Sequence, residues 1–221
     1  MRYIIGADEV GRGCLAGPVH VCGAAFPSDM PHIQGVRDSK QLSPHGREKM
    51  FKILRGTAGA YWQIASRTPD QIESLGINIA VKECFLEVTE RLLKTLQTEG
   101  HGVDAIRIDG PSLWPPNRFQ VPTEFIIKGD DTDWVIGAAS IVAKVTRDAL
   151  MDELAAQHPG YGWERNKGYG TAEHTAAIRQ RGLTPLHRPK FCRAFGAVSL
   201  PRKPQVFVDE GVNVFDLFGE D

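Results

Sequence analysis

The sequence lacks the features that mark secreted, thiolate-metal and membrane proteins. Its four cysteines, Cys14, Cys22, Cys84 and Cys192, form no CxxC pair and no zinc-like spacing with histidine, so we expect reduced packing residues. The N-terminal apolar run is too short for a signal peptide, and no segment approaches the roughly 18 uninterrupted apolar residues of a membrane span. These absences predict a cytoplasmic protein without membrane association.

The sequence also lacks an excess of charge of either sign. It has 26 Lys and Arg against 27 Asp and Glu, which gives a formal net charge of -1 over 221 residues. A near-neutral total does not exclude a nucleic-acid binder, because a basic face and an acidic site can cancel in the sum. The length allows one large domain with a substantial core, with or without an appendage.

Short apolar segments alternate with helix-capping signatures and predict an α/β domain with a mixed sheet. Strands are expected at 2–8, 19–26, 60–66, 103–108 and 125–127. Helices are expected from Ser43-Pro44 to Gly56, after Thr68, and at 78–96, 134–157 and 171–181. Asp131 or Asp133 is expected to cap the helix at 134–157. The glycine- and aromatic-rich segment after Pro159 is predicted to be an ordered, irregular loop.

Carboxylates follow three of these strands. Asp8 and Glu9 end the first, Asp109 precedes a glycine, and Asp130 follows Lys128-Gly129. Because strand ends present side chains on loops, we expect these acids to converge, although the pair Asp8-Glu9 alone would also suit a solvated turn. A cluster of carboxylates repels itself unless a cation neutralises it, and an all-oxygen donor set favours Mg²⁺ or Mn²⁺. Two such ions would support phosphodiester cleavage.

Two details of the acidic cluster are less simple. Adjacent residues of a regular strand face opposite sides, so we expect the first strand to stop or bulge at Glu9, with Asp8 as the central ligand. Asp131 and Asp133 lie beside Asp130 in the sequence, and their spacing does not decide which of the three takes part.

A Gly-Arg-Gly turn follows the first strand. Gly11 and Gly13 allow unusual dihedral angles and let the backbone lie against a ligand, where its N–H and C=O groups can bond a ribose 2'-hydroxyl. The alternatives are a plain turn and a dinucleotide fingerprint. The spacing of GRGCLAG and the strand predicted after it do not fit the dinucleotide motif.

A second candidate loop is basic and aromatic. Trp163, Arg165, Lys167 and Tyr169 sit among glycines, a composition that suits phosphates and a sugar or base face. Between 165 and 193 the only acid is Glu173, against a local basic excess of Arg165, Lys167, Arg179, Arg181, Arg188, Lys190 and Arg193. A solvated surface is the alternative interpretation.

The helix expected at 134–157 contains small residues, Ala138, Ala139 and Ser140, which suit close packing on the sheet. Lys144 and Asp148 are four residues apart and so share one helix face. We interpret Asp148 as half of an exposed ion pair, whereas Lys144 could point toward the acids or a phosphate.

Six motifs together carry a resemblance to a known family. GADEVGRGCLAGPV, DSKQLS, IDG, KGD, AASIVAKVTRD and NKGYGT, in this order and at these separations, closely resemble ribonuclease HII, the bacterial type 2 ribonuclease H. The resemblance covers the chain from about Tyr3 to about Phe195. It implies a ribonuclease H-like mixed β-sheet flanked by helices, with a helical C-terminal part at about 159–200 in a catalytic domain of residues 1–200.

The resemblance also implies an activity. A metal-dependent endonuclease of this family cleaves the RNA strand of RNA/DNA hybrids, leaving 3'-hydroxyl and 5'-phosphate ends. It incises duplex DNA on the 5' side of single embedded ribonucleotides, a step of ribonucleotide excision repair. The sequence does not distinguish Mg²⁺ from Mn²⁺ as cofactor, nor long hybrids from single ribonucleotides as the preferred substrate. We expect a monomer.

Residue roles carry over by matching motifs. The four acids of the family fall on Asp8, Glu9, Asp109 and Asp130, both as catalytic residues and as metal ligands. The expected substrate contacts are the 2'-hydroxyl sensor Gly11, Arg12 and Gly13, the sugar-stacking Tyr169, and the phosphate-binding residues Ser39, Lys40 and Lys167. Cys14 stands where the family often has proline, which should change only turn rigidity, and HRPKFCRAF is looser than the usual family pattern.

Residues 201–221 form a predicted linker and tail outside this core. The segment Val214–Phe218 is similar to short motifs that dock on the DNA sliding clamp, with valine in place of the usual glutamine. The alternative is an apolar segment that folds back onto its own domain. Two other classes of function stay open at this point, a non-catalytic nucleic-acid-binding module and a nucleotide-dependent oxidoreductase.

Overall fold

The computed structural model describes residues 1–36 and 42–195. Its sheet has five strands in the order β3-β2-β1-β4-β5. The strands are β1 (Arg2–Val10), β2 (Val19–Pro27), β3 (Tyr61–Arg67), β4 (Gly102–Asp109) and β5 (Thr123–Ile126). The sheet is mixed and flanked by helices, which confirms the predicted fold class.

Parallel pairing brings the acidic strand ends together. β1 pairs parallel with β4, with Ala7 opposite Ile108, and β4 pairs parallel with β5, with Asp109 opposite Ile126. Because parallel strands end at the same edge of a sheet, residues that follow β1, β4 and β5 meet there. A register shift in β1 lies between Tyr3 and Ile4, far from this edge.

The helices begin and end close to the predicted residues. They are α1 (Pro44–Arg55), α2 (Pro69–Leu75), α3 (Ile77–Thr98), α4 (Gly129–Thr132), α5 (Trp134–Gln157), α6 (Trp163–Asn166), α7 (Ala172–Arg181) and α8 (Pro189–Cys192), followed by a 3-10 turn at Arg193–Phe195. Ser43 caps α1, Thr68 and Gln71 form a capping box at α2, and Thr171 caps α7. The segment expected to be an irregular loop contains α6, so that expectation is wrong for four residues.

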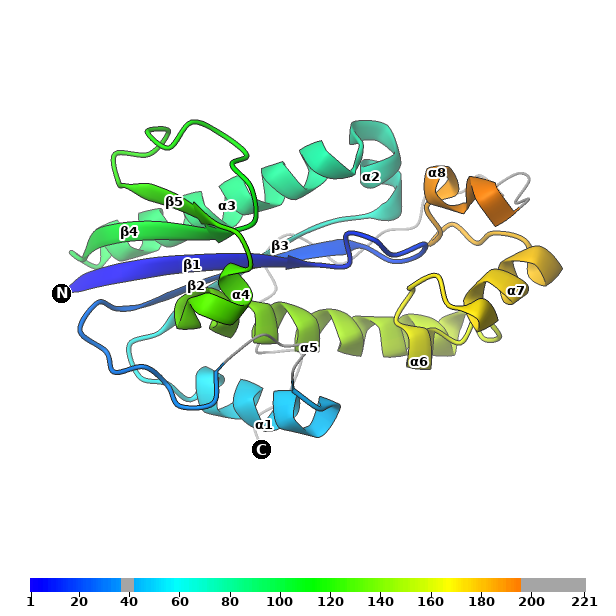
Figure 1. The fold of residues 1–221 in the computed structure, drawn as a ribbon, viewed down its shortest axis with the longest axis horizontal. Coiled ribbons are helices and arrows are strands. Elements are labelled where there is room, and N and C mark those ends of the chain that lie inside the picture. The colour runs from blue at the N-terminus through cyan, green and yellow to red at the C-terminus, as the bar shows by residue number, and fades with distance from the viewer. Residues whose placement is uncertain (37–41, 196–221) are drawn as a thin grey trace. The chain divides into compact units, whose positions relative to one another are not determined.

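Close packing fixes α3 and α5 against the sheet, and Figure 1 shows them on either side of the strands. A Cβ on Gly6 of β1 would lie 2.7 Å from the carbonyl carbon of Val135 in α5. A Cβ on Gly23 of β2 would lie 2.9 Å from Leu92 of α3. Glycine is therefore needed where these helices cross the strands.

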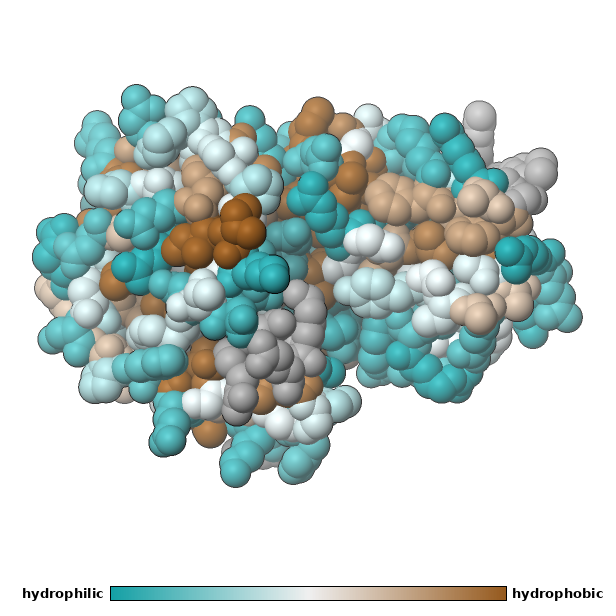
Figure 2. Space-filling model, in the orientation of Figure 1, coloured by the Kyte–Doolittle hydropathy of each residue, from teal (hydrophilic) through white to brown (hydrophobic). Residues whose placement is uncertain are grey.

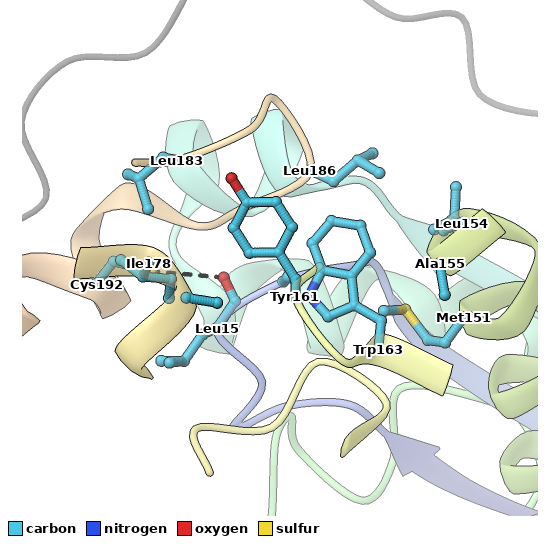
Figure 3. Close-up of a cluster of buried hydrophobic side chains, with 12 residues drawn as sticks. Leu15, Met151, Leu154, Ala155, Tyr161, Trp163, Ile178, Leu183, Leu186 and Cys192 are labelled. Atoms are coloured by element: carbon cyan, nitrogen blue, oxygen red, sulfur yellow. Dashed lines mark hydrogen bonds between the residues drawn. The ribbon is translucent and has the colours of Figure 1, made fainter. Parts of the chain in front are cut away.

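Packing divides the chain into two compact units. Among the described residues, the first contains 1–10, 21–36, 42–65 and 82–145, and the second contains 11–20, 66–81 and 146–195. Figure 3 shows the core of the second unit, in which the rings of Tyr161 and Trp163 stack 5.3 Å apart. The expected boundary between the catalytic domain and the tail, after residue 200, lies outside the described residues.

The surface carries few large apolar side chains. Those exposed among the described residues are Met1, Ile53, Ile79, Ile127 and Tyr169. In Figure 2 a strongly apolar group lies over the end of β5, next to hydrophilic atoms around α4. All four cysteines are free and buried, as predicted. Within the described residues no helix is long and apolar enough to cross a membrane.

Candidate active site

Three carboxylates converge where β1 and β4 end. One carboxylate oxygen from each of Asp8, Glu9 and Asp109 lies within 4.8 Å of the other two, a separation at which one metal ion can be shared. Asp8 is buried, whereas Glu9 and Asp109 are half-buried and open to solvent. The convergence follows directly from the parallel pairing of the two strands.

Asp130 joins this group through the turn after β5. Asp109 Oδ1 accepts hydrogen bonds from the backbone N–H of Gly129 at 2.6 Å and of Asp130 at 3.4 Å. Lys128 adopts a left-handed conformation with a φ of 56°, which starts α4 and directs the next two N–H groups at Asp109. A Cβ on Gly129 would lie 2.5 Å from Ile136 Cδ1, so a larger residue there would require the end of the Ile136 side chain to move.

The charged form of Asp8 is unfavourable in this cluster. Burial raises its pKa well above the ordinary value, and the neighbouring charges of Glu9, Asp109 and Asp130 raise it further. A hydrogen bond from the Ser140 hydroxyl lowers the pKa and partly offsets these effects. The cluster is therefore unfavourable as a set of bare anions and suits a bound cation.

The structure corrects the expected interruption of β1. The strand continues through Val10, so it neither stops nor bulges at Glu9. Pairing with β4 ends at Ala7, and the Glu9 N–H donates to Asp8 Oδ1 at 2.7 Å. The Asp8 carboxylate thus lies along its own strand toward Glu9, whose longer side chain reaches the same place.

The structure distinguishes the three aspartates that follow β5. Asp130 is buried beside Asp8, and Asp131 is exposed. Asp133 caps α5, because its Oδ1 accepts the N–H groups of Val135 and Ile136, and its Oδ2 pairs with Arg107 at 2.8 Å. Asp133 is thus engaged in structure, and Asp130 is the candidate ligand.

These donors fit a hard divalent cation. The converging ligand atoms are carboxylate oxygens, with neither thiolate nor imidazole among them, and this is the set that Mg²⁺ and Mn²⁺ prefer. The raised pKa of Asp8 is the physical sign of an uncompensated negative charge that a cation would relieve.

The Gly-Arg-Gly turn belongs to the second unit and uses its two glycines differently. Gly11 has a φ of 88°, and a Cβ there would lie 2.2 Å from Arg147 Nε. Gly13 does not have a positive φ and is exposed, and a Cβ there would meet nothing within 4 Å. The expected unusual dihedral is therefore confirmed for Gly11 and wrong for Gly13.

Arg12, between the two glycines, is held by the second unit. Its Nη2 donates to Asn78 Oδ1 at 2.6 Å, and its backbone carbonyl accepts from Arg188 Nη1 at 3.0 Å. Asn78, in the first turn of α3, has no signal in the sequence that would have singled it out.

Tyr169 is exposed, with 39% of its surface accessible, as a residue that stacks on a ligand must be. Partial burial and its neighbour Cys14 raise the pKa of the Tyr169 phenol. Cys14 Sγ also lies 3.7 Å from the Lys167 carbonyl oxygen, so the cysteine packs against the loop that carries the tyrosine. The expectation that Cys14 affects only turn rigidity thus misses this contact.

Other parts of the basic loop differ from expectation. Trp163 is fully buried, so it offers no face to a ligand. Arg188 is also fully buried and bonds backbone carbonyls. Ion pairs with carboxylates hold three more of the basic residues: Arg165 with Glu164 and Glu173, Lys167 with Asp152, and Lys190 with Glu73. The local basic excess is therefore smaller at the surface than in the sequence.

The remaining candidates are Lys144, Ser39 and Lys40. Lys144 is half-buried on α5, one turn beyond Ser140 and so on the helix face that meets Asp8. Ser39 and Lys40 lie outside the described residues.

Known proteins share this fold and these motifs. The family model described as Ribonuclease HII matches residues 5–194. The chain belongs to the ribonuclease HII family. It is 43% identical over 189 residues to the ribonuclease HII of Ruegeria pomeroyi, a match that covers 85% of this chain and 75% of the relative.

Solved structures agree on the fold. The ribonuclease H2 of Pyrococcus horikoshii superposes with a TM-score of 0.71 at 24% identity, over 87% of this chain and 96% of that one. The RNase HII of Archaeoglobus fulgidus, solved in a complex with PCNA, gives a TM-score of 0.68 at 24% identity over 85% and 93% of the two chains. The ribonuclease H-like fold expected from the motifs is confirmed.

Membership of the ribonuclease HII family defines the general activity. The protein is a ribonuclease H, a metal-dependent hydrolase that cuts the RNA strand of RNA/DNA hybrids internally. The family depends on a divalent metal ion, in agreement with the carboxylate cluster.

Proposed function

We propose that this ribonuclease H incises duplex DNA on the 5' side of a single embedded ribonucleotide, with two divalent ions and with 3'-hydroxyl and 5'-phosphate products. The observation that carries the proposal is the convergence of Asp8, Glu9 and Asp109 around a position suited to a hard cation. When bound, such ions activate a water molecule and stabilise the leaving oxygen.

The acids divide the work by burial. Asp8 is the buried ligand whose charge is hardest to tolerate without a cation, and Ser140 orients its carboxylate through a hydrogen bond. The N–H groups of Gly129 and Asp130 hold the Asp109 carboxylate in a defined orientation. Glu9 and Asp130 complete the proposed catalytic and metal-binding set.

Recognition of the ribose rests on Gly11, Arg12 and Gly13. Gly11 gives the turn its shape, and the exposed Gly13 has no side chain of its own that would keep a ligand away from the backbone there. Accessible N–H and C=O groups bond a 2'-hydroxyl, the group that distinguishes RNA from DNA. The exposed ring of Tyr169 stacks on the sugar that follows the ribonucleotide.

Lysines and a serine are assigned to the phosphates. Lys144 and Lys167 are half-buried, and Lys167 forms an ion pair with the exposed Asp152 that a phosphate can replace. Ser39 and Lys40 are assigned to phosphate contacts from their motif alone.

The test uses three end-labelled duplexes of one sequence: all DNA, DNA with one ribonucleotide, and a uniform RNA/DNA hybrid. With Mg²⁺ or Mn²⁺ we expect one cut 5' of the ribonucleotide, several cuts in the hybrid and none in DNA. The same lanes with chelator should show no cut. A cut on the 3' side, or an intact single-ribonucleotide duplex beside a cleaved hybrid, would contradict the proposal.

Tyr169→Ala tests the proposed role of the exposed ring. Loss of base or sugar stacking is worth about 1–3 kcal/mol, so turnover on the single-ribonucleotide duplex should fall about tenfold or more. Mn²⁺ affinity should be unchanged, because Tyr169 and the acids belong to different units. A loss of metal affinity in this variant would show the assignment to be wrong.

We also propose that Val214–Phe218 docks as a short apolar peptide in a groove of the DNA sliding clamp. The segment lies outside the described residues. The clamp complex of the Archaeoglobus fulgidus RNase HII supports an interaction of this type. Deletion of residues 201–221 should abolish clamp binding in a titration and leave cleavage of free duplex unchanged, whereas unchanged clamp affinity would end the idea.

A further inference from the structure

A buried arginine that the motifs did not single out joins the two proposed recognition elements. Arg147 of α5 is fully buried in the second unit. Its Nε donates to the Pro18 carbonyl oxygen at 2.9 Å and its Nη2 to the Ala16 carbonyl oxygen at 3.2 Å. Its Nη1 donates to the Lys167 carbonyl oxygen at 2.9 Å. One guanidinium thus binds both the loop after β1 and the loop before Tyr169.

The same guanidinium lies against the start of the Gly-Arg-Gly turn. A Cβ on Gly11 would be 2.2 Å from Arg147 Nε and 2.8 Å from its Cζ. Gly11 therefore lies too close to the Arg147 side chain for any larger residue, and it has a positive φ of 88°, which favours glycine. Arg147 fixes where the turn begins.

Backbone contacts fasten the two loops to each other. The N–H groups of Leu15 and Ala16 donate to the Gly168 carbonyl oxygen at 2.8 Å and 3.3 Å. A Cβ on Gly168 would lie 2.4 Å from the Ala16 carbonyl oxygen, so no larger residue allows this approach. Gly168 directly precedes Tyr169, which places the tyrosine at the end of the fastened segment.

We propose that Arg147 is a positioning residue that holds the Gly11–Gly13 turn and Tyr169 at one fixed separation, and so sets the preference for a ribonucleotide followed by DNA. This inference rests on the proposed function of those two elements. A single planar fork reaches three carbonyl oxygens in two loops at once, which a lysine ammonium cannot reproduce. Substrate strands that engage both elements depend on that separation, whereas the proposed metal ligands belong to the other unit.

Arg147→Lys tests the inference, with Leu154→Ala as the matched control. Leu154 lies seven residues further along α5 in the apolar cluster of the same unit, so its truncation destabilises the unit without removing a bond to either loop. The readout is the ratio of kcat/KM on the single-ribonucleotide duplex to kcat/KM on the uniform hybrid. Misplacement of a positioned group by about 1 Å can cost about 100-fold in rate, and we expect this ratio to fall about tenfold or more in Arg147→Lys.

The control variant should lose thermal stability but keep the wild-type ratio, and Mn²⁺ affinity should be unchanged in both. A wild-type ratio in Arg147→Lys, together with a loss of stability like that of Leu154→Ala, would overturn the inference. Should Arg147→Lys not fold, Gly168→Ala keeps the arginine but pushes on the Ala16 carbonyl oxygen that Arg147 binds, so it should lower the ratio in the same way.

Amide hydrogen exchange separates this inference from the proposed function. In Arg147→Lys we expect faster exchange at the Leu15 N–H, which bonds Gly168, and no such change in Leu154→Ala. Unchanged exchange at Leu15 would overturn the positioning role even if the substrate assay gave no activity. A wild-type protein that leaves the single-ribonucleotide duplex intact, with faster exchange in the variant, would instead contradict the proposed function alone.

Discussion

The acidic cluster of the first unit and the arginine-held loops of the second unit bury charge in opposite ways. Asp8 is buried next to other carboxylates, so its neighbours add to the cost of burial. Arg147 and Arg188 are fully buried next to backbone carbonyl oxygens, which satisfy their donors. Arg188 donates to the carbonyl oxygens of Gly17 and Arg12.

The difference separates a region that needs a ligand from one that is complete without it. The buried Asp8 has a hydrogen bond from Ser140 but carboxylates as its charged neighbours, so a bound cation would stabilise it further. Each buried guanidinium donates from all three of its nitrogens to backbone carbonyl oxygens, so it is stabilised from within the chain. We infer that metal binding organises the acidic cluster of Asp8, Glu9 and Asp109. The recognition loops, which are the Gly11–Gly17 loop after β1 and the loop that leads to Tyr169, are formed before any substrate arrives.

The largest expected effect is that of Asp8→Asn. Cleavage should fall by about 1,000-fold or more, because this variant loses a buried metal ligand. The metal-free variant should nevertheless melt at a higher temperature than the metal-free wild type, because the raised pKa of Asp8 marks a cost that asparagine does not carry. Activity assays and thermal melts with chelator check both statements. A metal-free variant less stable than wild type would contradict the electrostatic comparison.

The recognition loops should be complete only while two histidines stay neutral. His187 Nδ1 accepts the Thr184 N–H at 2.9 Å, so its Nε2 carries the proton and donates to His174 Nε2 at 3.2 Å. His174 Nε2 also accepts from Trp163 Nε1 at 3.0 Å, which leaves His174 Nδ1 to donate to the Tyr169 carbonyl oxygen at 2.9 Å. A further proton on His174 Nε2 would face the N–H groups of Trp163 and His187, and one on His187 Nδ1 would break the bond that this nitrogen accepts from the Thr184 N–H.

Acid should therefore destabilise the second unit. Burial, and then the neighbouring His174, lowers the pKa of His187 to about 3. The unfolded chain takes up this proton below its ordinary pKa of about 6.5, so the free energy of unfolding should fall as the pH drops from about 6.5 toward 3, by at most about 1.4 kcal/mol per pH unit. Urea unfolding at pH 7 and pH 5 measures the slope.

His187→Gln is the control for this pH effect, because glutamine keeps an acceptor and a donor but does not titrate. Its free energy of unfolding should depend less steeply on pH than that of the wild type. Some dependence should remain, since burial also lowers the pKa of His20 to about 3. Equal slopes in the two proteins would exclude His187 as a source of the acid sensitivity.

Gly11 and Gly13 of the recognition turn should respond differently to substitution by alanine. Gly11→Ala should cost about 1–3 kcal/mol of stability, because alanine is strained at a φ of 88° and its Cβ would collide with Arg147. Gly13→Ala should change stability by less than about 0.5 kcal/mol, because its Cβ points into open space. Cleavage 5' of a ribonucleotide should fall in both variants.

Gly13 is the informative member of this pair. A stable Gly13→Ala variant that cuts less but binds DNA duplex normally would show that the exposed backbone touches the substrate. Wild-type cleavage by this variant would remove Gly13 from the recognition set and leave Gly11 as a purely structural residue.

At the metal site itself, Ser140→Ala should have a smaller effect than Asp8→Asn. The hydroxyl of Ser140 stabilises the charged form of Asp8, so its loss should raise the pKa of Asp8 further and weaken Mn²⁺ binding about tenfold. Calorimetric titration with Mn²⁺ measures the change. Ala139→Ser at the neighbouring buried position is a control for altered packing of α5, and an equal loss of affinity there would exclude a specific role for the Ser140 hydroxyl.

Much of the fold could be predicted because its signals are local. The capping residues Ser43, Thr68 and Thr171 act within one helical turn, and each helix begins where they predict. The strand-end acids could be predicted to converge, because parallel strands end at the same edge of a sheet. Asp133 rather than Asp131 caps α5, a choice that depends on Arg107 of β4 and is not local.

The missed residues share one cause, which is that their partners are distant in the sequence. Arg147 donates to Pro18 and Ala16, which lie 129 and 131 positions earlier in the sequence, and to Lys167, which lies 20 positions later. Arg188 and Trp163 lie in segments whose composition is typical of a surface loop. Both side chains are buried, because these segments pack around Leu15. Charge and aromaticity alone do not reveal which side chains the tertiary structure will cover.

The most direct test of the central claim is a calorimetric titration of chelator-treated wild type and Asp8→Asn with Mn²⁺ at neutral pH. We predict that the wild type binds Mn²⁺, because the ion offsets the negative charge of Asp8 that burial and the neighbouring carboxylates make unfavourable. The variant, which lacks this carboxylate, should bind far more weakly. Equal binding by the two proteins would contradict the claim that the buried carboxylate cluster is the metal site.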